Sequence, residues 1–302
     1  MKRIGWIFWG AVFLWTPPLQ AKIRVVTTTT DLAAIVREIG GDRVEVQSIA
    51  KGYQDPHYVE AKPSYIRIVN QADLLVYVGL QLEIGWLPLL IQGARNPKVL
   101  PGAQGNLDAS RGIEILEVPK GEVDRTMGDI HPEGNPHYWL DPRNGIVIGR
   151  AIADRLKTLS PEEASYFEKN LSAFTKGLQE MIHLWEERMV SYQGLEIACD
   201  HKQWEYLASW LGLKIVGLVE DRPGIPPTPK HIAELIALMG ERKISLLLNA
   251  NFYDPSASRK IAERTGAQLI VLPTSVGGED GIERYPLLFD RILSIFKTGI
   301  GE

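Results

Sequence analysis

Short runs of β-branched and aliphatic residues alternate with longer amphipathic stretches along most of the chain. In the first half these runs are residues 23–29, 44–49 and 74–78, and helical patterns begin near Asp31, Pro63 and Glu83. In the second half they are residues 196–199, 214–219, 244–248 and 269–272, with helical patterns from about Lys202, Thr228, Pro255 and Glu283. Strands that alternate with helices predict mostly parallel sheets flanked by helices. Two such sets predict an α/β fold with two lobes.

One long helical pattern separates the two sets. It begins at Ser160-Pro161, where we expect an N-cap serine, proline in the first turn and a capping box completed by Glu163. The pattern continues to about Tyr192, and some thirty residues at 1.5 Å per residue make a rod of about 45 Å. A rod of this length predicts a backbone helix that joins the lobes. Two helices broken near Gly177 are the alternative that the pattern leaves open.

The first 21 residues have the pattern of a signal peptide. Lys2 and Arg3 precede an apolar run over residues 4–15, shorter than the ~20 residues that span a bilayer, and Ala21 suits the position before the cut. No cysteine lies near this cut, so we expect a protein exported to the periplasm without a lipid anchor. The expected division is a signal peptide (1–21), an N-terminal lobe (22–158), the linking helix (159–193) and a C-terminal lobe (194–302).

Composition narrows the functional classes. The 302 residues carry a formal net charge of −4 and show no basic stripe, which argues against a nucleic-acid partner. The single cysteine excludes an internal disulfide and a cysteine-rich zinc site. Any metal site must therefore be built from histidine and carboxylate. We expect a monomer.

Three of the six histidines lie in loops near the ends of predicted strands. His57 follows the run that ends at residue 49, His201 comes directly after residues 196–199, and His137 lies in a loop that could reach the same edge. Ligands of open α/β sheets bind beyond the carboxyl ends of the strands, and imidazole suits zinc, copper, iron and nickel. Together the three positions favour a metal site, although each histidine alone could be an ordinary polar residue.

The surrounding motifs resemble those of the metal-binding solute-binding proteins of zinc and manganese ABC importers. The resemblance rests on the Asp55-Pro56-His57 loop, the Asn135-Pro136-His137 loop and the aromatic-rich stretch after His201, and it runs from about residue 23 to 296. That family has two α/β lobes joined by one long helix, which agrees with the predicted rod. The resemblance implies that His57, His137 and His201 are the metal ligands.

The fourth ligand departs from the family pattern. Many relatives have a carboxylate just after the last strand of the second lobe, where this chain has Ser275, a poor match. We expect Glu279 or Asp280 from the same glycine-rich loop to take its place. Glu60 beside the first histidine, or a water, is an alternative, and His131 is a candidate accessory ligand.

The resemblance implies a carrier, not an enzyme, that delivers a divalent metal to an ABC permease in the inner membrane. A metallochaperone is a candidate second partner. A histidine-rich donor set favours Zn2+ over Mn2+ or Fe2+. The alternative is an exported zinc enzyme with an open water position, for which Glu60, Asp200 or Glu220 could act as base. A long rigid helix between the lobes also predicts that they move little on binding.

Overall fold

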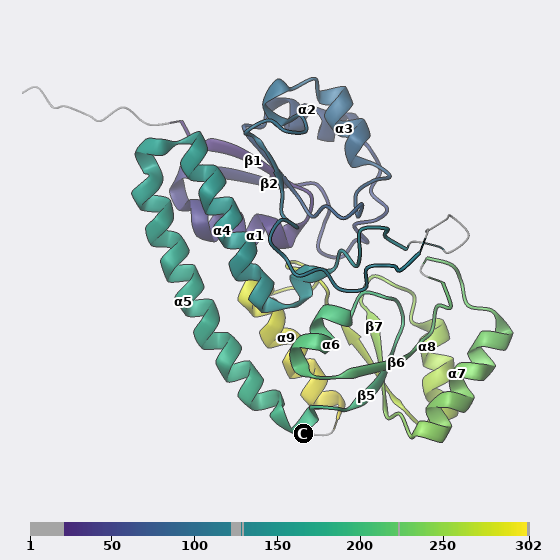
Figure 1. Ribbon diagram of the computed structural model, residues 1–302. Coiled ribbons are helices and arrows are strands. Elements are labelled where there is room, and N and C mark those ends of the chain that lie inside the picture. Colours follow the sequence, from purple (N-terminus) through teal and green to yellow (C-terminus); the bar gives the residue numbers. More distant parts are fainter. Residues whose placement is uncertain (1–20, 122–127, 129, 223, 301–302) are drawn as a thin grey trace, which may run out of the picture.

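The computed structural model describes residues 21–121, 128, 130–222 and 224–300, and within them two parallel sheets form the framework (Figure 1). The first sheet has the order β2-β1-β3-β4 and the second has the order β6-β5-β7-β8. The strands are β1 (Ile23–Thr27), β2 (Val44–Ser48), β3 (Leu74–Tyr77), β4 (Asn106–Asp108), β5 (Glu196–Cys199), β6 (Lys214–Leu218), β7 (Leu246–Ala250) and β8 (Gln268–Leu272). The predicted α/β class is confirmed. The pattern missed β4, whose three residues include Asn and Asp, both uncommon in strands.

Helices cover both faces of each sheet. They are α1 (Thr30–Gly40), α2 (Pro63–Gln71), α3 (Leu87–Ala94), α4 (Pro142–Leu159), α6 (Glu205–Leu211), α7 (Pro229–Arg242), α8 (Ser256–Thr265) and α9 (Tyr285–Gly299). Neighbouring residues of a strand point to opposite faces. Val25 accordingly packs in one hydrophobic cluster with residues of α1, whereas Val26 packs in a second cluster with residues of α2 and α3. In the second sheet Leu248 and Leu247 divide in the same way.

The linking helix α5 (Ala164–Met189) runs alongside both lobes (Figure 1). Its 26 residues continue through Gly177 without a break, so the two-helix alternative is wrong. The predicted capping box is also wrong. A 3-10 turn over Pro161–Glu163 precedes the helix, and the Ser160 hydroxyl donates to the Glu162 carboxylate (2.6 Å) instead of capping a backbone N–H.

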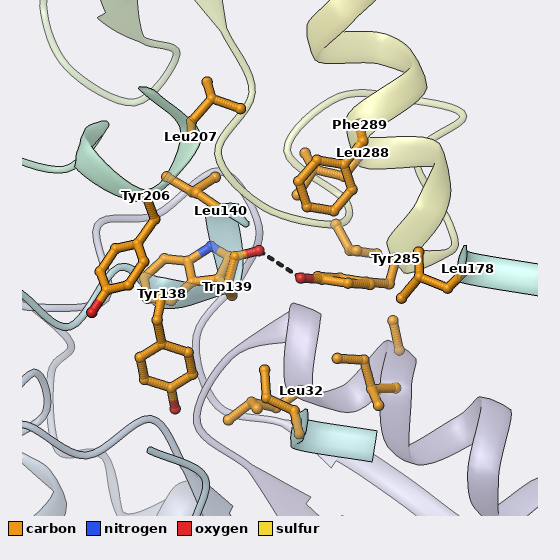
Figure 2. Packing of buried hydrophobic residues seen from close by; sticks show 14 of the residues in the cluster. Leu32, Tyr138, Trp139, Leu140, Leu178, Tyr206, Leu207, Tyr285, Leu288 and Phe289 are labelled. Carbon is orange, nitrogen blue, oxygen red and sulfur yellow. Dashed lines mark hydrogen bonds between the residues drawn. The ribbon is translucent and has the colours of Figure 1, made fainter. Parts of the chain in front are cut away.

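The largest hydrophobic cluster includes residues of both lobes (Figure 2). Leu32 of α1, Leu178 of α5 and Phe289 of α9 are all members. The Tyr285 hydroxyl donates to the Trp139 carbonyl oxygen (2.6 Å), which ties α9 to the turn before α4. Because the lobes share one core, they cannot separate widely without exposing apolar surface.

The predicted signal peptide lies outside the described residues except for Ala21, and the domain boundaries stay a prediction. Across the described ranges, none of the helices combines the length and apolar character needed to cross a membrane.

Candidate metal centre

The three predicted histidines come together between the two sheets. His57 follows β2, His201 follows β5, and His137 precedes the 3-10 turn Tyr138–Leu140 that leads into α4. The ring centroid of His57 lies 5.2 Å from that of His137 and 6.1 Å from that of His201, and the rings of His137 and His201 are 6.0 Å apart. Residues separated by up to 144 positions thus meet at one point.

His131 completes the group. Its ring centroid lies 5.2 Å from that of His57 and 6.5 Å from that of His137. A small cavity of about 30 Å³ is lined by His131, His137 and His201, together with Glu117 and Lys202, among others. This space is sufficient for one water or one ion. The Glu117 carboxylate pairs with Lys202 (2.7 Å), so the acid at this cavity is already engaged by a cation.

Each predicted ligand has an oxygen acceptor at its Nδ1 atom. A carboxylate can only accept, and the amide oxygen of Asn135 also accepts, so Nδ1 carries the proton in the neutral rings. The lone pair of each neutral imidazole therefore lies on Nε2, where it can bind a cation. The acceptors are Asp55 for His57 (2.7 Å), Asn135 for His137 (2.9 Å) and Glu220 for His201 (2.7 Å).

Two of these arrangements share one local sequence pattern. In Asp55-Pro56-His57 the Asp55 Oδ1 atom accepts both the backbone N–H (2.9 Å) and the ring Nδ1–H of His57. In Asn135-Pro136-His137 the Asn135 Oδ1 atom does the same, with the backbone bond at 3.0 Å. An Asx side chain that bonds two residues ahead is a local turn, and proline stiffens it. The pattern therefore places each ring beside its acceptor by short-range contacts.

Burial controls the charge of the histidines. It lowers the pKa of His137 well below 6.5, and the neighbouring imidazoles lower it further. Burial, followed by the charges of His57 and His201, lowers the pKa of His131 to about 3. Burial alone would lower the pKa of His201 as well, but the hydrogen bond and charge of Glu220 outweigh it and raise this pKa. His131 and His137 are therefore neutral at neutral pH, which is the form that binds metals.

The ring spacing is close to that of a metal site but still open. The Nε2 atoms of His57 and His131 are 3.1 Å apart, near the ~3.3 Å expected for two nitrogens bound at 2.0–2.1 Å to a tetrahedral zinc. The ring centroid of His201 lies 6.1 Å from that of His57 and 6.0 Å from that of His137, and the centroids of His131 and His137 are 6.5 Å apart. In the described part of the chain no three His, Cys, Asp or Glu side chains are yet close enough to hold an ion. We therefore expect the rings to draw together slightly when a metal binds.

The structure does not bring the predicted carboxylates to this cluster. Glu279 pairs with Arg291 of α9 (2.6 Å), and Asp280 is exposed. Glu60 is also exposed and lies 3.5 Å from Lys62. The glycine-rich turn accounts for the position of Glu279, because backbone bonds from Gly277 to Ile282 and from Gly278 to Ser275 turn the loop towards α9. His131 instead lies beside His57 and His137.

Sequence reasoning missed Tyr253, which lies just after β7. Its hydroxyl donates to the Asp55 Oδ2 atom (2.8 Å), and its ring centroid is 5.4 Å from that of His201. Burial alone would raise the pKa of Asp55, but hydrogen bonds from His57 and Tyr253 contribute to holding it below its usual value. The available signal was position, since Tyr253 follows a strand at the same sheet edge as His201.

Comparison with known proteins gives a consistent match. The family model described as "ZnuA: Zinc-uptake complex component A periplasmic" matches residues 25–299. The manganese ABC transporter substrate-binding lipoprotein PsaA of Streptococcus pneumoniae is 26% identical over 279 residues, covering 88% of this chain and 86% of the relative. The metal ABC transporter substrate-binding lipoprotein FimA of Streptococcus parasanguinis is 26% identical over 278 residues, covering 89% and 86%.

Solved structures share the fold. A crystal structure of ZnuA has a TM-score of 0.76 at 22% identity and covers 92% of this chain and 99% of its own. The Mn-bound periplasmic metal binding protein from Candidatus Liberibacter asiaticus has a TM-score of 0.76 at 21% identity, covering 92% and 100%. A Cd-bound form of the periplasmic metal binding protein from that organism also has a TM-score of 0.76, at 21% identity, with the same coverage. The two-lobed architecture with a linking helix is confirmed.

The relatives correct one prediction. PsaA and FimA are named as lipoproteins, which contradicts the expected location without a lipid anchor, and that prediction was wrong. It rested on the missing cysteine near residue 21. The missing cysteine concerns only the attachment of a lipid near residue 21, and the segment before that residue lies outside the described residues.

Proposed function

Since the chain belongs to the ZnuA family, the metal-binding components of ABC importers, we propose that its cargo is a single zinc ion held between the lobes. Members of this family are substrate-binding proteins and not enzymes, so the zinc-enzyme alternative has no support. The metal itself is the transported substrate, and a membrane permease is the partner that receives it.

We assign the ligands to the Nε2 atoms of His57, His137 and His201, with His131 as the fourth. The observation that carries this proposal is the set of oxygen acceptors at the three Nδ1 atoms. Such acceptors fix ring orientation and raise the basicity of a histidine that binds a metal. Histidines at an ordinary surface would not be expected to share an oxygen acceptor at Nδ1 in all three cases. His131 supports the set because its Nε2 atom faces that of His57.

The donor chemistry favours zinc over manganese. Manganese prefers carboxylate and carbonyl oxygen, whereas imidazole nitrogen suits zinc. The nearby acids already have other partners, since Glu117 pairs with Lys202 and Glu220 accepts from His201. PsaA is named for manganese, so we expect this chain to differ from that relative in its preferred metal.

The test is a zinc and manganese competition with the purified chain from residue 22. We expect one zinc per chain and displacement of Mn2+ by an equal concentration of Zn2+. The matched pair His131→Ala and Glu279→Ala decides the fourth ligand. His131→Ala should weaken zinc binding at least about tenfold, whereas Glu279→Ala should leave it unchanged because Glu279 faces Arg291.

Two results would overturn this proposal. A chain that retains manganese against excess zinc would refute the choice of metal. A loss of affinity in Glu279→Ala, with His131→Ala unaffected, would restore the carboxylate as fourth ligand and remove His131 from the site.

A further inference from the structure

Tyr253 connects the two halves of the histidine cluster through one side chain. It lies after β7 of the second sheet, where its ring contacts that of His201. Its hydroxyl reaches Asp55, which follows β2 of the first sheet, at 2.8 Å. Asp55 in turn bonds the Nδ1 atom of His57. A chain of two hydrogen bonds thus runs from the second lobe to a histidine of the first.

We propose that Tyr253 is a positioning residue, through which the second lobe sets the orientation of His57. The inference rests on the proposed function, in which His57 is a metal ligand. The Tyr253–Asp55 link therefore makes ligation by the first lobe depend on contact with the second. Even a small shift of the second lobe would then release His57 from its orientation as His201 moves away.

The two oxygens of Asp55 have separate tasks. Oδ1 accepts from the backbone and ring of His57, and Oδ2 accepts from Tyr253. The side chains of Asp55 and His57 are only 13% and 8% exposed, so water has little access to replace a lost donor. A buried carboxylate oxygen without a donor is costly. Loss of the Tyr253 hydroxyl should therefore let Asp55 rotate towards water and leave His57 without a fixed acceptor.

The same arrangement occurs at His137. The Asn135 oxygen accepts from His137, and its amide nitrogen donates to the Glu205 carboxylate (3.0 Å) and the Lys202 carbonyl oxygen (3.2 Å) of the second lobe. His57 and His137 of the first lobe are thus each oriented by an Asx side chain. The other polar atom of that side chain bonds the second lobe. His201 differs, because its acceptor Glu220 belongs to its own lobe. This repetition supports a common positioning role.

The experiment is a double-mutant cycle on zinc affinity. Tyr253→Phe keeps the ring beside His201 and removes only the hydroxyl. We expect about a tenfold loss of affinity, at the low end of the range for partners of metal-bound histidines, through faster dissociation. In an Asp55→Ala background Tyr253→Phe should cause no further loss, because the hydroxyl then has no acceptor.

Tyr77→Phe is the matched control. Its hydroxyl donates to the Asn106 Oδ1 atom (3.2 Å) within the first sheet and has no described contact with the histidines. It should bind zinc as the wild type does. The inference is overturned if Tyr253→Phe also binds zinc as the wild type does. It is equally overturned if Tyr253→Phe lowers zinc affinity by the same factor in the Asp55→Ala background as in the wild type.

A second measurement separates this inference from the proposed function. In the metal-free chain, nitrogen NMR reports the Nδ1–H of His57 directly. We expect Tyr253→Phe to weaken that signal and shift it, whereas the signals of His231, whose Nε2–H donates to the Leu218 carbonyl oxygen (2.8 Å), stay in place. A wild type that binds no zinc would refute the proposed function alone. Unchanged His57 signals in Tyr253→Phe would refute the positioning role alone.

Discussion

At the scale of single residues, the Asx-Pro-His pattern explains how two rings reach a fixed orientation. Asp55 and Asn135 each bond the backbone and the ring of the histidine two positions later. Local bonds of this kind place each ring beside its acceptor, and contacts from the second lobe hold the acceptor side chain itself. Two ligands are therefore placed by short loops of the first lobe, and the second lobe adds His201.

A buried acid links the lobes outside the histidine cluster. Asp31 lies at the start of α1, and its Oδ1 atom accepts the backbone N–H of Val276 from the loop after β8 (2.9 Å). Its Oδ2 atom has no hydrogen-bond partner among the described residues. Burial raises the pKa of Asp31 from 3.8 to about 7, although the bonds from Val276 and Ser275 partly oppose the rise.

We predict that Asp31 makes the metal-free protein less stable as the pH rises from about 4 to about 7. In this window the folded state keeps a proton that the unfolded state releases, so the free energy of unfolding falls. Asp31→Asn should remove this fall in the free energy of unfolding. From pH 4 to pH 8, the difference in the free energy of unfolding between variant and wild type should therefore shift by a few kcal/mol in favour of the variant. Urea unfolding at both pH values measures the difference. If the free energy of unfolding changed with pH in the same way in both proteins, the raised pKa of Asp31 would be contradicted.

The sequence predicted the positions of three histidines better than that of the fourth donor. His57, His137 and His201 lie beside strand or helix ends that hydrophobic patterns reveal. The direction of Glu279 depends instead on a glycine-rich turn and on Arg291 of α9, which no local pattern shows. His131 was predicted as an accessory ligand, but it belongs to a loop without periodicity, so only the folded chain shows its approach to His57.

At the scale of elements, α5 holds the lobes at a fixed distance. Its 26 residues extend about 39 Å at 1.5 Å per residue. One face is buried against α1, α4 and α9, and the buried side chains are Phe167, Leu171, Phe174, Leu178, Ile182, Trp185 and Met189. These positions recur every three or four residues, which is why the pattern predicted the helix. Its first turn was misread because the Ser160 side chain bonds Glu162.

Gly177 provides a test of this helix. A Cβ atom there would meet nothing within 4 Å, and glycine inside a helix costs about 0.5–1 kcal/mol relative to alanine. Gly177→Ala should therefore raise the free energy of unfolding by about that amount and leave zinc affinity unchanged. Chemical denaturation measures the gain.

Gly145 of α4 is the matched control. A Cβ atom there would collide with the buried ring of Tyr285, so Gly145→Ala should destabilise the protein by about 1–3 kcal/mol. If both substitutions changed stability in the same direction, the packing of α5 and α4 against α9 would be incorrectly described.

At the scale of the whole molecule, the shared core limits how far the lobes can move. Trp139 donates to the Thr274 carbonyl oxygen (2.9 Å), and Arg284 pairs with Glu38 across the lobes (2.6 Å). The ring centroids of the histidines already lie 5.2–6.5 Å apart, so we expect only a small approach on metal binding. The two-lobed arrangement was predictable from alternating strands and helices. The continuity of the core was not, because periodicity shows which face is buried and not what covers it.

We therefore predict a small structural response to zinc. The radius of gyration from X-ray scattering should stay within error on saturation, while fluorescence from Trp139, beside His137, should change. A wide closure, seen as a clear decrease in the radius of gyration, would contradict the role given to α5 and the shared core.

The central claim is that imidazoles from both lobes bind one zinc ion. Anomalous diffraction at the zinc edge from crystals of the zinc-loaded chain tests it most directly. We predict one strong peak per chain, about 2.0–2.1 Å from the Nε2 atoms of His57, His137, His201 and His131. A peak elsewhere in the chain, or one bound by Glu279 or Asp280 without the histidines of both lobes, would contradict the account.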